Sequence, residues 1–214
     1  MSNQPVYRLH GGLMSSNTRR AALAFAHLAV PYELVPVNLR DSADRAKLVK
    51  VNPNNKIPVL EHGDFLLWES HAIMQYVAAQ VPGQTVYPVD PRGRADVDRW
   101  LFWLTGHFAP PLGTLGWERV WKKLVTGQDG DPAQIARGEA EWHVVAKIAD
   151  RHLAQRSWLS GDAMTLADLS IAATLANAAM YRAPLDPYPQ LRAIHDRVAK
   201  LPAWQATQPP PMTR

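Results

Sequence analysis

Three side chains with hydroxyl or amide groups, Ser15, Ser16 and Asn17, come directly before an alanine-rich segment at 18–28 that is typical of a helix. The first N–H groups of a helix have no partner within the helix, and the helix dipole favours negative charge beside them. A polar side chain in this position can cap the helix, or it can donate a hydrogen bond to a bound anion. The residue types alone leave both roles open, and capping is the more common one.

A second polar helix start ends the segment 52–73, NPNNKIPVLEHGDFLLWESHAI. Short apolar runs at 59–61 and 65–67 flank a His-Gly-Asp turn, which predicts a β-hairpin. Glu69 and Ser70 then begin a helix. Because the Ser70 hydroxyl would lie beside unpaired N–H groups, this helix start is a second candidate anion site.

The composition limits the chemistry that this chain can do with its own side chains. The chain has no cysteine, which excludes a protein thiol nucleophile, a disulfide and a thiolate metal site. Its eight histidines show no metal-ligand spacing, so we expect no metal. The net charge of +4 is spread along the chain, which does not favour a nucleic-acid-binding face.

The same numbers favour a globular protein outside the membrane. The chain has 214 residues, of which 47% are apolar and 20% are charged, and this is typical of one or two folded domains. No apolar run approaches the roughly 18 residues of a membrane span, and the first residues lack the features of a signal peptide. We therefore expect a cytoplasmic protein without a membrane partner.

The order of the predicted elements divides the chain in two. In the first part, 1–80, strands and helices follow the order βαβαββα, which predicts a mixed sheet with helices on its faces. The segment 81–91 contains three prolines and a glycine, and we interpret it as a linker. The part 92–214 is predicted to be all helical. The elements expected in the first part are strands at 6–9, 32–37, 59–61 and 65–67, and helices at 18–28, at 45–51 and from Glu69-Ser70 onward.

Helix starts and stops organise the second part. A periodic aromatic segment at 96–108 is expected to end at Pro110-Pro111, because proline lacks the N–H that an interior helical residue donates. Asp131-Pro132 is typical of an N-cap followed by the first helical residue. Thr165 and Asp168 have the spacing of a capping box, for which we expect a purely structural role.

Two of these segments resemble a known family. NPNNKIPVLEHGDFLLWESHAI is similar to the glutathione-binding segment of the glutathione transferase superfamily. The segment Gly161–Asp168 resembles the family motif G-D-x-x-T-x-A-D. The resemblance implies an α/β thioredoxin-like domain that binds glutathione, followed by an all-helical domain. It also implies a homodimer, and a cis peptide bond before Pro58.

The resemblance further implies five glutathione-binding residues. Ser70 and its helix N-terminus would take the γ-glutamyl carboxylate, and Glu69 would face the γ-glutamyl ammonium group. Ile57 would pair its backbone with the cysteinyl part of glutathione, beside Pro58. Lys56 would supply a cation for the carboxylates of the peptide.

For catalysis, the segment 15–20, SSNTRR, resembles the pattern S-x-x-T-R-R of family members that use a serine. This assigns stabilisation of the glutathione thiolate to Ser15, with Ser16 and Asn17 as the alternatives. An ordinary thiol has a pKa near 8.5, so only a small fraction of it is thiolate at neutral pH without an aimed donor.

The resemblance also implies a pocket for a hydrophobic electrophile, formed by Leu13 and Met14 together with the aromatic residues Trp103, His107 and Trp117. The predicted function is a glutathione S-transferase that directs the thiolate of bound glutathione at this electrophile. Alternatives are a non-catalytic binding protein with the same fold, and a glutathione-dependent isomerase or dehalogenase. The isomerase-like class carries S-S-C where this chain has S-S-N, and the missing cysteine disfavours that activity.

Overall fold

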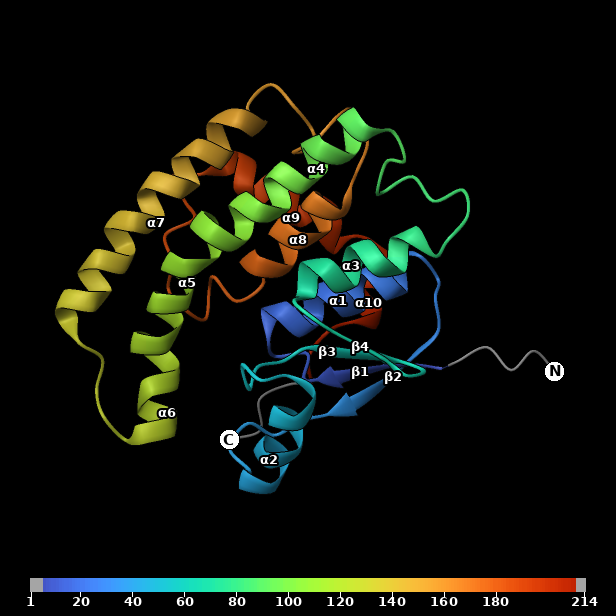
Figure 1. Cartoon of the computed structure of the whole chain (residues 1–214). Helices are drawn as coiled ribbons and strands as arrows, with labels where there is room; N and C mark the ends of the chain where they lie inside the picture. The colour runs from blue at the N-terminus through green and yellow to red at the C-terminus, as the bar shows by residue number, and fades with distance from the viewer. Residues whose placement is uncertain (1–5, 211–214) are drawn as a thin grey trace. The chain divides into compact units, whose positions relative to one another are not determined.

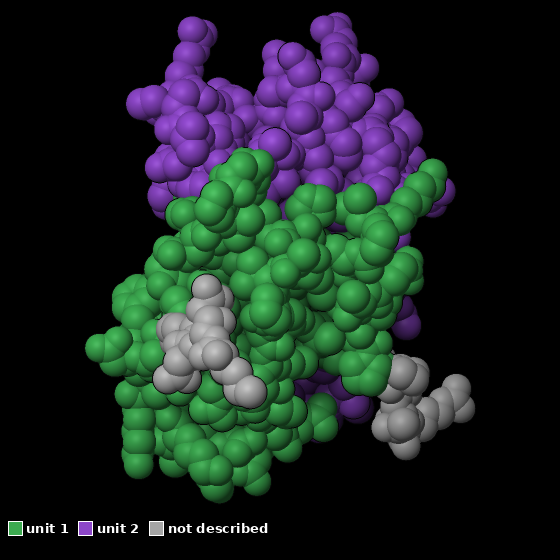
Figure 2. Space-filling view, turned by 90° about the vertical axis from the view of Figure 1, so that its right-hand side faces the viewer, with its two compact units in different colours: residues 1–84, 200–214 green, residues 85–199 purple. Residues whose placement is uncertain are grey.

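The computed structural model describes residues 6–210, which fall into two compact units. The first unit consists of 1–84 and 200–214, and the second consists of 85–199 (Figure 2). From the sequence we expected 92–214 to form one helical domain. Helix α10, Pro202–Ala206, instead packs against α1, Ser16–His27, in the first unit. The Arg19 guanidinium carbon lies 3.8 Å from the centre of the Trp204 ring, so a cation–π contact ties α10 to α1.

The elements of the first unit follow the predicted order βαβαββα. They are β1 Tyr7–Gly11, α1, β2 Tyr32–Pro36, α2 Ser42–Val51, β3 Val59–His62, β4 Phe65–Trp68 and α3 Ser70–Ala79. The strand order is β2-β1-β3-β4, with β1 and β2 parallel and the other pairs antiparallel, which confirms the predicted mixed sheet. Figure 1 shows α1 and α3 on one side of the sheet and α2 on the other.

The core of this unit lies between the sheet and the pair α1 and α3. Leu9 of β1 and Leu60 of β3 are register partners, and both are fully buried. They belong to one cluster with Phe25 of α1 and Ile73 of α3. Every residue of α1 from 18 to 25 is buried, so the helix carries two arginines into the interior together with its apolar residues.

Two backbone features flank the hairpin of β3 and β4. The Ile57-Pro58 peptide bond is cis, as the resemblance implied. The buried Asn52 donates from Nδ2 to the Lys56 carbonyl at 2.8 Å and so fixes the loop before that bond. Glu69, directly after β4, has a φ of +72° and a ψ of 111°, which is a strained conformation for a residue with a Cβ.

An uninterrupted succession of helical turns runs through 91–126 of the second unit, so the prediction that Pro110-Pro111 ends a helix is wrong. The parts are α4 Pro91–Trp103, the π-helix η1 Leu104–Phe108, α5 Ala109–Gly116, the π-helix η2 Trp117–Trp121 and α6 Lys122–Thr126. In η1, the Ala109 N–H donates to the Leu104 carbonyl five residues earlier. This wider turn comes directly before the prolines and relieves the clash between a proline ring and the carbonyl four residues before it.

The other predicted helix starts of the second unit are confirmed. The Asp131 side chain accepts the Ala133 N–H at 2.8 Å and caps α7, Pro132–Leu153. Thr165 and Asp168 form the capping box of α8, Leu166–Leu175, and every residue of this helix is buried. Helix α9, Pro189–Ala199, follows it.

Asp168 places a carboxylate in the interior of this unit. The side chain is fully buried and accepts the Leu159 and Thr165 N–H groups, each at 2.7 Å. Burial raises the pKa of Asp168 from 3.8 to about 6, although these hydrogen bonds act in the opposite direction. The native protein therefore binds more protons than the unfolded chain in this window, and the contribution of Asp168 to stability is lost as the pH rises through it.

We predict that Asp168→Asn removes this decline, because asparagine does not ionise. The free energy of unfolding of the wild type should fall relative to that of the variant by about 3 kcal/mol from about pH 3.5 to pH 7, since one pKa unit is worth about 1.4 kcal/mol. Urea unfolding followed by circular dichroism at several pH values measures the difference. Parallel stability curves for the two proteins would contradict the prediction.

The strained backbone at Glu69 predicts that glycine is better tolerated there than alanine. Glycine adopts a positive φ without steric cost, whereas alanine keeps the clash of its Cβ. We expect Glu69→Gly to be more stable than Glu69→Ala by about 1 kcal/mol, the lower end of the range for such strain. Denaturant unfolding without ligand compares the two variants, which both lack the carboxylate. Equal stability would show that the backbone at this residue stores no strain.

Candidate functional site

Three connections that carry predicted site residues leave the four-stranded sheet at the same end. In the antiparallel register, His10 of β1 lies opposite Val59 of β3, and Val59 lies opposite Trp68 of β4. The loop after β1, the cis peptide bond before β3 and the helix start after β4 therefore begin beside one another. The sheet thus brings together the predicted catalytic and glutathione-binding segments of the first unit.

Ser15 is the N-cap of α1 in the loop after β1. Its side-chain oxygen accepts the Thr18 N–H at a long 3.4 Å, and its own N–H donates to the Gly12 carbonyl at 2.9 Å. Ser16 and Asn17 are the first two residues of the helix, with Ser16 half-buried and Asn17 exposed. The capping role is therefore present at Ser15, but it uses the oxygen of the hydroxyl and not its hydrogen.

Ser70 is the first residue of α3 and has only 6% of its surface exposed. Its Oγ accepts a hydrogen bond from Nη1 of Arg20 at 2.9 Å, so a cation on α1 holds this hydroxyl. Glu69, at the N-cap position, is exposed and makes no side-chain hydrogen bond to the helix. The helix start therefore presents a fixed hydroxyl and an exposed carboxylate next to each other.

Arg20 is a site residue that the sequence analysis missed. Burial lowers the pKa of its guanidinium to about 10, with Glu69 acting in the opposite direction, so Arg20 is charged at neutral pH. Burial, and then the nearby Arg20, hold the pKa of His71 well below its usual value, which leaves that imidazole neutral. The sequence signal that could have identified Arg20 is the unbroken apolar run 21–26. A helix that is apolar on all sides is buried, and the arginine directly before this run is then buried with it.

The loop before β3 holds the other predicted binding residues. Lys56 is exposed, Ile57 is half-buried and Pro58 is buried. The Lys56 carbonyl is occupied by Asn52, so the side chain is the part of this residue that can reach a ligand. The structure places the three residues at the sheet end described above, one after another.

The predicted electrophile-contacting residues are divided between the units. Leu13 and Met14 are half-buried and directly precede Ser15 in the first unit. In the second unit, Trp103 ends α4 and stacks at 6.5 Å on the ring of His107 in η1. Trp117 begins η2 and is 43% exposed.

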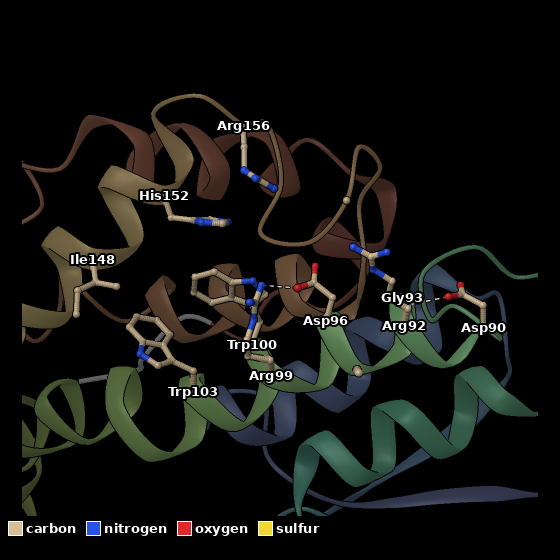
Figure 3. Close-up of a pocket in the computed structure, with 12 residues that line it drawn as sticks. Asp90, Arg92, Gly93, Asp96, Arg99, Trp100, Trp103, Ile148, His152 and Arg156 are labelled. Atoms are coloured by element: carbon tan, nitrogen blue, oxygen red, sulfur yellow. Dashed lines mark hydrogen bonds and ion pairs between the residues drawn. The ribbon is translucent and has the colours of Figure 1, made fainter.

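A groove of about 1020 Å³ lies between α4 and α7 of the second unit (Figure 3). The Trp100 and His152 rings lie 4.5 Å apart on its wall. Trp103 contributes to the groove, whereas His107 and Trp117 are not among its lining residues. The groove therefore does not bring the predicted electrophile-contacting residues together. Its charged lining residues are Asp90, Arg92, Asp96, Arg99 and Arg156.

Within residues 6–210, no group of three or more histidine, cysteine, aspartate or glutamate side chains is arranged to hold a metal ion. No helix in the same range is long and apolar enough to cross a membrane.

Comparison with known proteins identifies the family. Residues 5–79 match the model of the glutathione S-transferase N-terminal domain, and residues 140–206 match that of the glutathione S-transferase C-terminal domain. A glutathione S-transferase of Hyoscyamus muticus is 30% identical over 92% of this chain and 95% of its own length. Glutathione S-transferase PARB of Nicotiana tabacum is 32% identical over 76% of this chain and 77% of its own.

The fold agrees with that assignment. A solved structure of glutathione S-transferase-I bound with lactoylglutathione is 25% identical and has a TM-score of 0.84, covering 95% of this chain and 98% of that one. Both family models match, and they match the two parts that the sequence predicted to be thioredoxin-like and helical. The chain belongs to the glutathione S-transferase family.

Proposed function

We propose that this protein binds glutathione at the shared end of the sheet and directs its thiolate at a hydrophobic electrophile. The observation that carries the proposal is the buried Ser70 hydroxyl at the N-terminus of α3, held by Arg20 at 2.9 Å. A helix N-terminus with a hydroxyl and a nearby cation suits a carboxylate. The similar glutathione S-transferase-I, which was solved with lactoylglutathione, supports a ligand of this class.

The groups at this end of the sheet fit the chemistry of glutathione. The γ-glutamyl carboxylate would accept hydrogen bonds from the Ser70 hydroxyl and the first N–H groups of α3, and the ammonium group would face the exposed Glu69 carboxylate. The Ile57 backbone, next to the cis Pro58, would pair with the cysteinyl part of the peptide. The exposed Lys56 would face the remaining carboxylate.

Ser15 is the proposed donor to the glutathione sulfur. Lowering a thiol pKa by about two units requires about 2.7 kcal/mol of preferential binding of the thiolate, which one or two aimed donors supply. The cap contact uses the Ser15 oxygen, and the positive end of the α1 dipole lies beside it. Ser16 and Asn17 are the alternative donors because they occupy the next two positions.

The electrophile would contact Leu13 and Met14, which directly precede Ser15. The roles of Trp103, His107 and Trp117 in binding it stay a prediction. The family assignment supports two further parts of the proposal, a homodimer and a cytoplasmic location.

A second candidate function is a non-catalytic glutathione-binding protein. The observation in its favour is that Ser15 already serves as the N-cap of α1, which needs no chemistry. Titrating glutathione while recording thiolate absorbance near 240 nm separates the two functions. Binding without formation of thiolate at neutral pH would favour the non-catalytic protein.

We predict that Ser70→Ala and Glu69→Gln each weaken glutathione binding by about 10-fold to 100-fold. The reason is that each removes one charge-assisted hydrogen bond, which is worth about 1.5–3 kcal/mol. Isothermal titration calorimetry measures the dissociation constants, and Ser42→Ala at the start of α2 serves as the control. Wild-type affinity in both variants would remove this helix start from the binding site.

We predict that Ser15→Ala raises the pKa of the bound thiol towards its free value and lowers kcat by up to about 100-fold, because it removes one donor to a developing anion. Affinity for glutathione should stay within a few fold. The pH dependence of kcat with a generic aromatic electrophile, together with thiolate absorbance, measures both effects.

Ser16→Ala and Asn17→Ala are the matched controls and should leave the thiol pKa unchanged. If one of them raised the pKa while Ser15→Ala did not, the donor would be the neighbouring residue. If none of the three variants changed the pKa, the serine mechanism would be wrong.

A further inference from the structure

We propose that the groove between α4 and α7 binds a nucleoside di- or triphosphate, with the base against its aromatic side chains and the phosphates against its arginines. All residues that line the groove lie between 90 and 161, in the second unit. The inference therefore does not depend on the proposed glutathione site, whose residues belong to the first unit. The volume of about 1020 Å³ is large enough for a ligand of this size.

Aromatic side chains from both helices form one part of the groove (Figure 3). The Trp100 and Trp103 rings of α4 meet edge to face with their centres 5.3 Å apart, and the His152 ring of α7 lies 4.5 Å from that of Trp100. Together they offer the flat aromatic surface on which nucleobases stack. Any flat ring suits such a surface, so the polar groups and the charges decide the class of ligand.

Two ring nitrogens of the groove have unused capacity for hydrogen bonds. Trp100 is only 7% exposed, and its enclosed Nε1–H has no hydrogen-bond partner, which is costly for a buried donor. The His152 Nε2 lies 2.9 Å from the Leu159 carbonyl and must donate to it, because a carbonyl only accepts. This leaves His152 Nδ1 for a ligand. The edge of a nucleobase carries acceptors and donors for such groups, whereas a hydrocarbon ring carries neither.

Three arginines on the two sides of the groove provide cations for a ligand. Arg92 and Arg99 are seven residues apart on α4, which is two turns and about 10 Å along one face. Arg156 follows the end of α7 on the other side, and Figure 3 shows the Arg92 and Arg156 side chains directed into the space between the helices. A single carboxylate can meet only one of these cations. A chain of phosphates extends over several and can bind guanidinium groups through two oxygens each.

The two carboxylates of the groove are already engaged by the protein. Asp90 accepts a backbone N–H of the first turn of α4 at 2.8 Å. Asp96 accepts a serine hydroxyl at 2.6 Å and forms an ion pair with Arg99. In the part of the chain that the structure describes, the side chains of Arg92 and Arg156 have no hydrogen bond or ion pair. The groove therefore holds positive charge that a ligand with several negative charges would neutralise.

The test measures the binding of four probes to the full chain by isothermal titration calorimetry. The probes are ADP, adenosine, which lacks the phosphates, pyrophosphate, which lacks the base, and 1-naphthoate, which is a simple aromatic acid. The variants are Arg92→Gln, Arg156→Gln and Trp103→Leu. Arg151→Gln is the matched control, because Arg151 is an exposed arginine of α7 that does not line the groove.

We expect ADP to bind the wild type at least about tenfold more tightly than the other probes, because only ADP meets both parts of the groove. Arg92→Gln and Arg156→Gln should each weaken ADP binding by about twofold to tenfold, the effect of an exposed arginine on a phosphate, and leave adenosine unaffected. Trp103→Leu should weaken ADP and adenosine alike, by roughly tenfold, and leave pyrophosphate unaffected. Because both arginines are exposed, their variants decide the question if Trp103→Leu does not fold.

Binding of 1-naphthoate as tight as that of ADP would reveal a site for simple aromatic acids and overturn the inference. An ADP affinity that neither arginine variant changes would do the same, as would competition between ADP and glutathione, since glutathione is assigned to the first unit. Absence of ADP binding at about 1 mM would also reject it. If, in that case, the arginine variants changed the oligomeric state in gel filtration, the occupant of the groove would be a second copy of the chain.

Discussion

The register between β1, β3 and β4 is the constraint on which the candidate site depends. Leu9 and Leu60 are partners in this register and are fully buried, and a slip by one residue would turn an entire strand's apolar side chains to the opposite face. The same register sets Val59 opposite both His10 and Trp68, which fixes the sheet end where the three connections begin. The apolar core therefore determines where polar groups that are not part of it come together.

Several of these polar groups are held at a cost to the stability of the fold. Arg20 is a buried cation, and Glu69 has a backbone conformation that few residues with a Cβ adopt. Strand β1 and helix α1, which Ser15 connects as the N-cap, also approach very closely, since a Cβ built on Gly11 would lie 2.5 Å from Thr18 Oγ1. Binding sites commonly retain such costs because they preorganise groups for a ligand. In the first unit, such costly features lie at the start of α1 and at the start of α3.

The sequence predicted the order of elements well, because that order depends on local signs. The cap at Asp131 and the Thr165–Asp168 capping box were found from residue type and spacing alone. The cis bond at Pro58 came from the family resemblance and not from the residues. The features that were missed depend on the whole fold. Pro110-Pro111 does not end a helix, since a π-helical turn before it relieves the clash, and Arg20 meets Ser70 only after α1 and α3 pack together.

The first unit is discontinuous in sequence, because α10 returns to it after the whole second unit has intervened. Proteins are synthesised from the N-terminus, so the surface of α1 that receives Trp204 stays uncovered until α10 has been made. The chain between α1 and α10 is long, but the entropic cost of bringing the ends of a segment together grows only slowly with its length. The segments proposed to bind glutathione are therefore synthesised before α10, and α1, which Ser15 caps, is completely packed only after α10 has been made. The first unit is therefore complete only when α10 has joined its strands and helices.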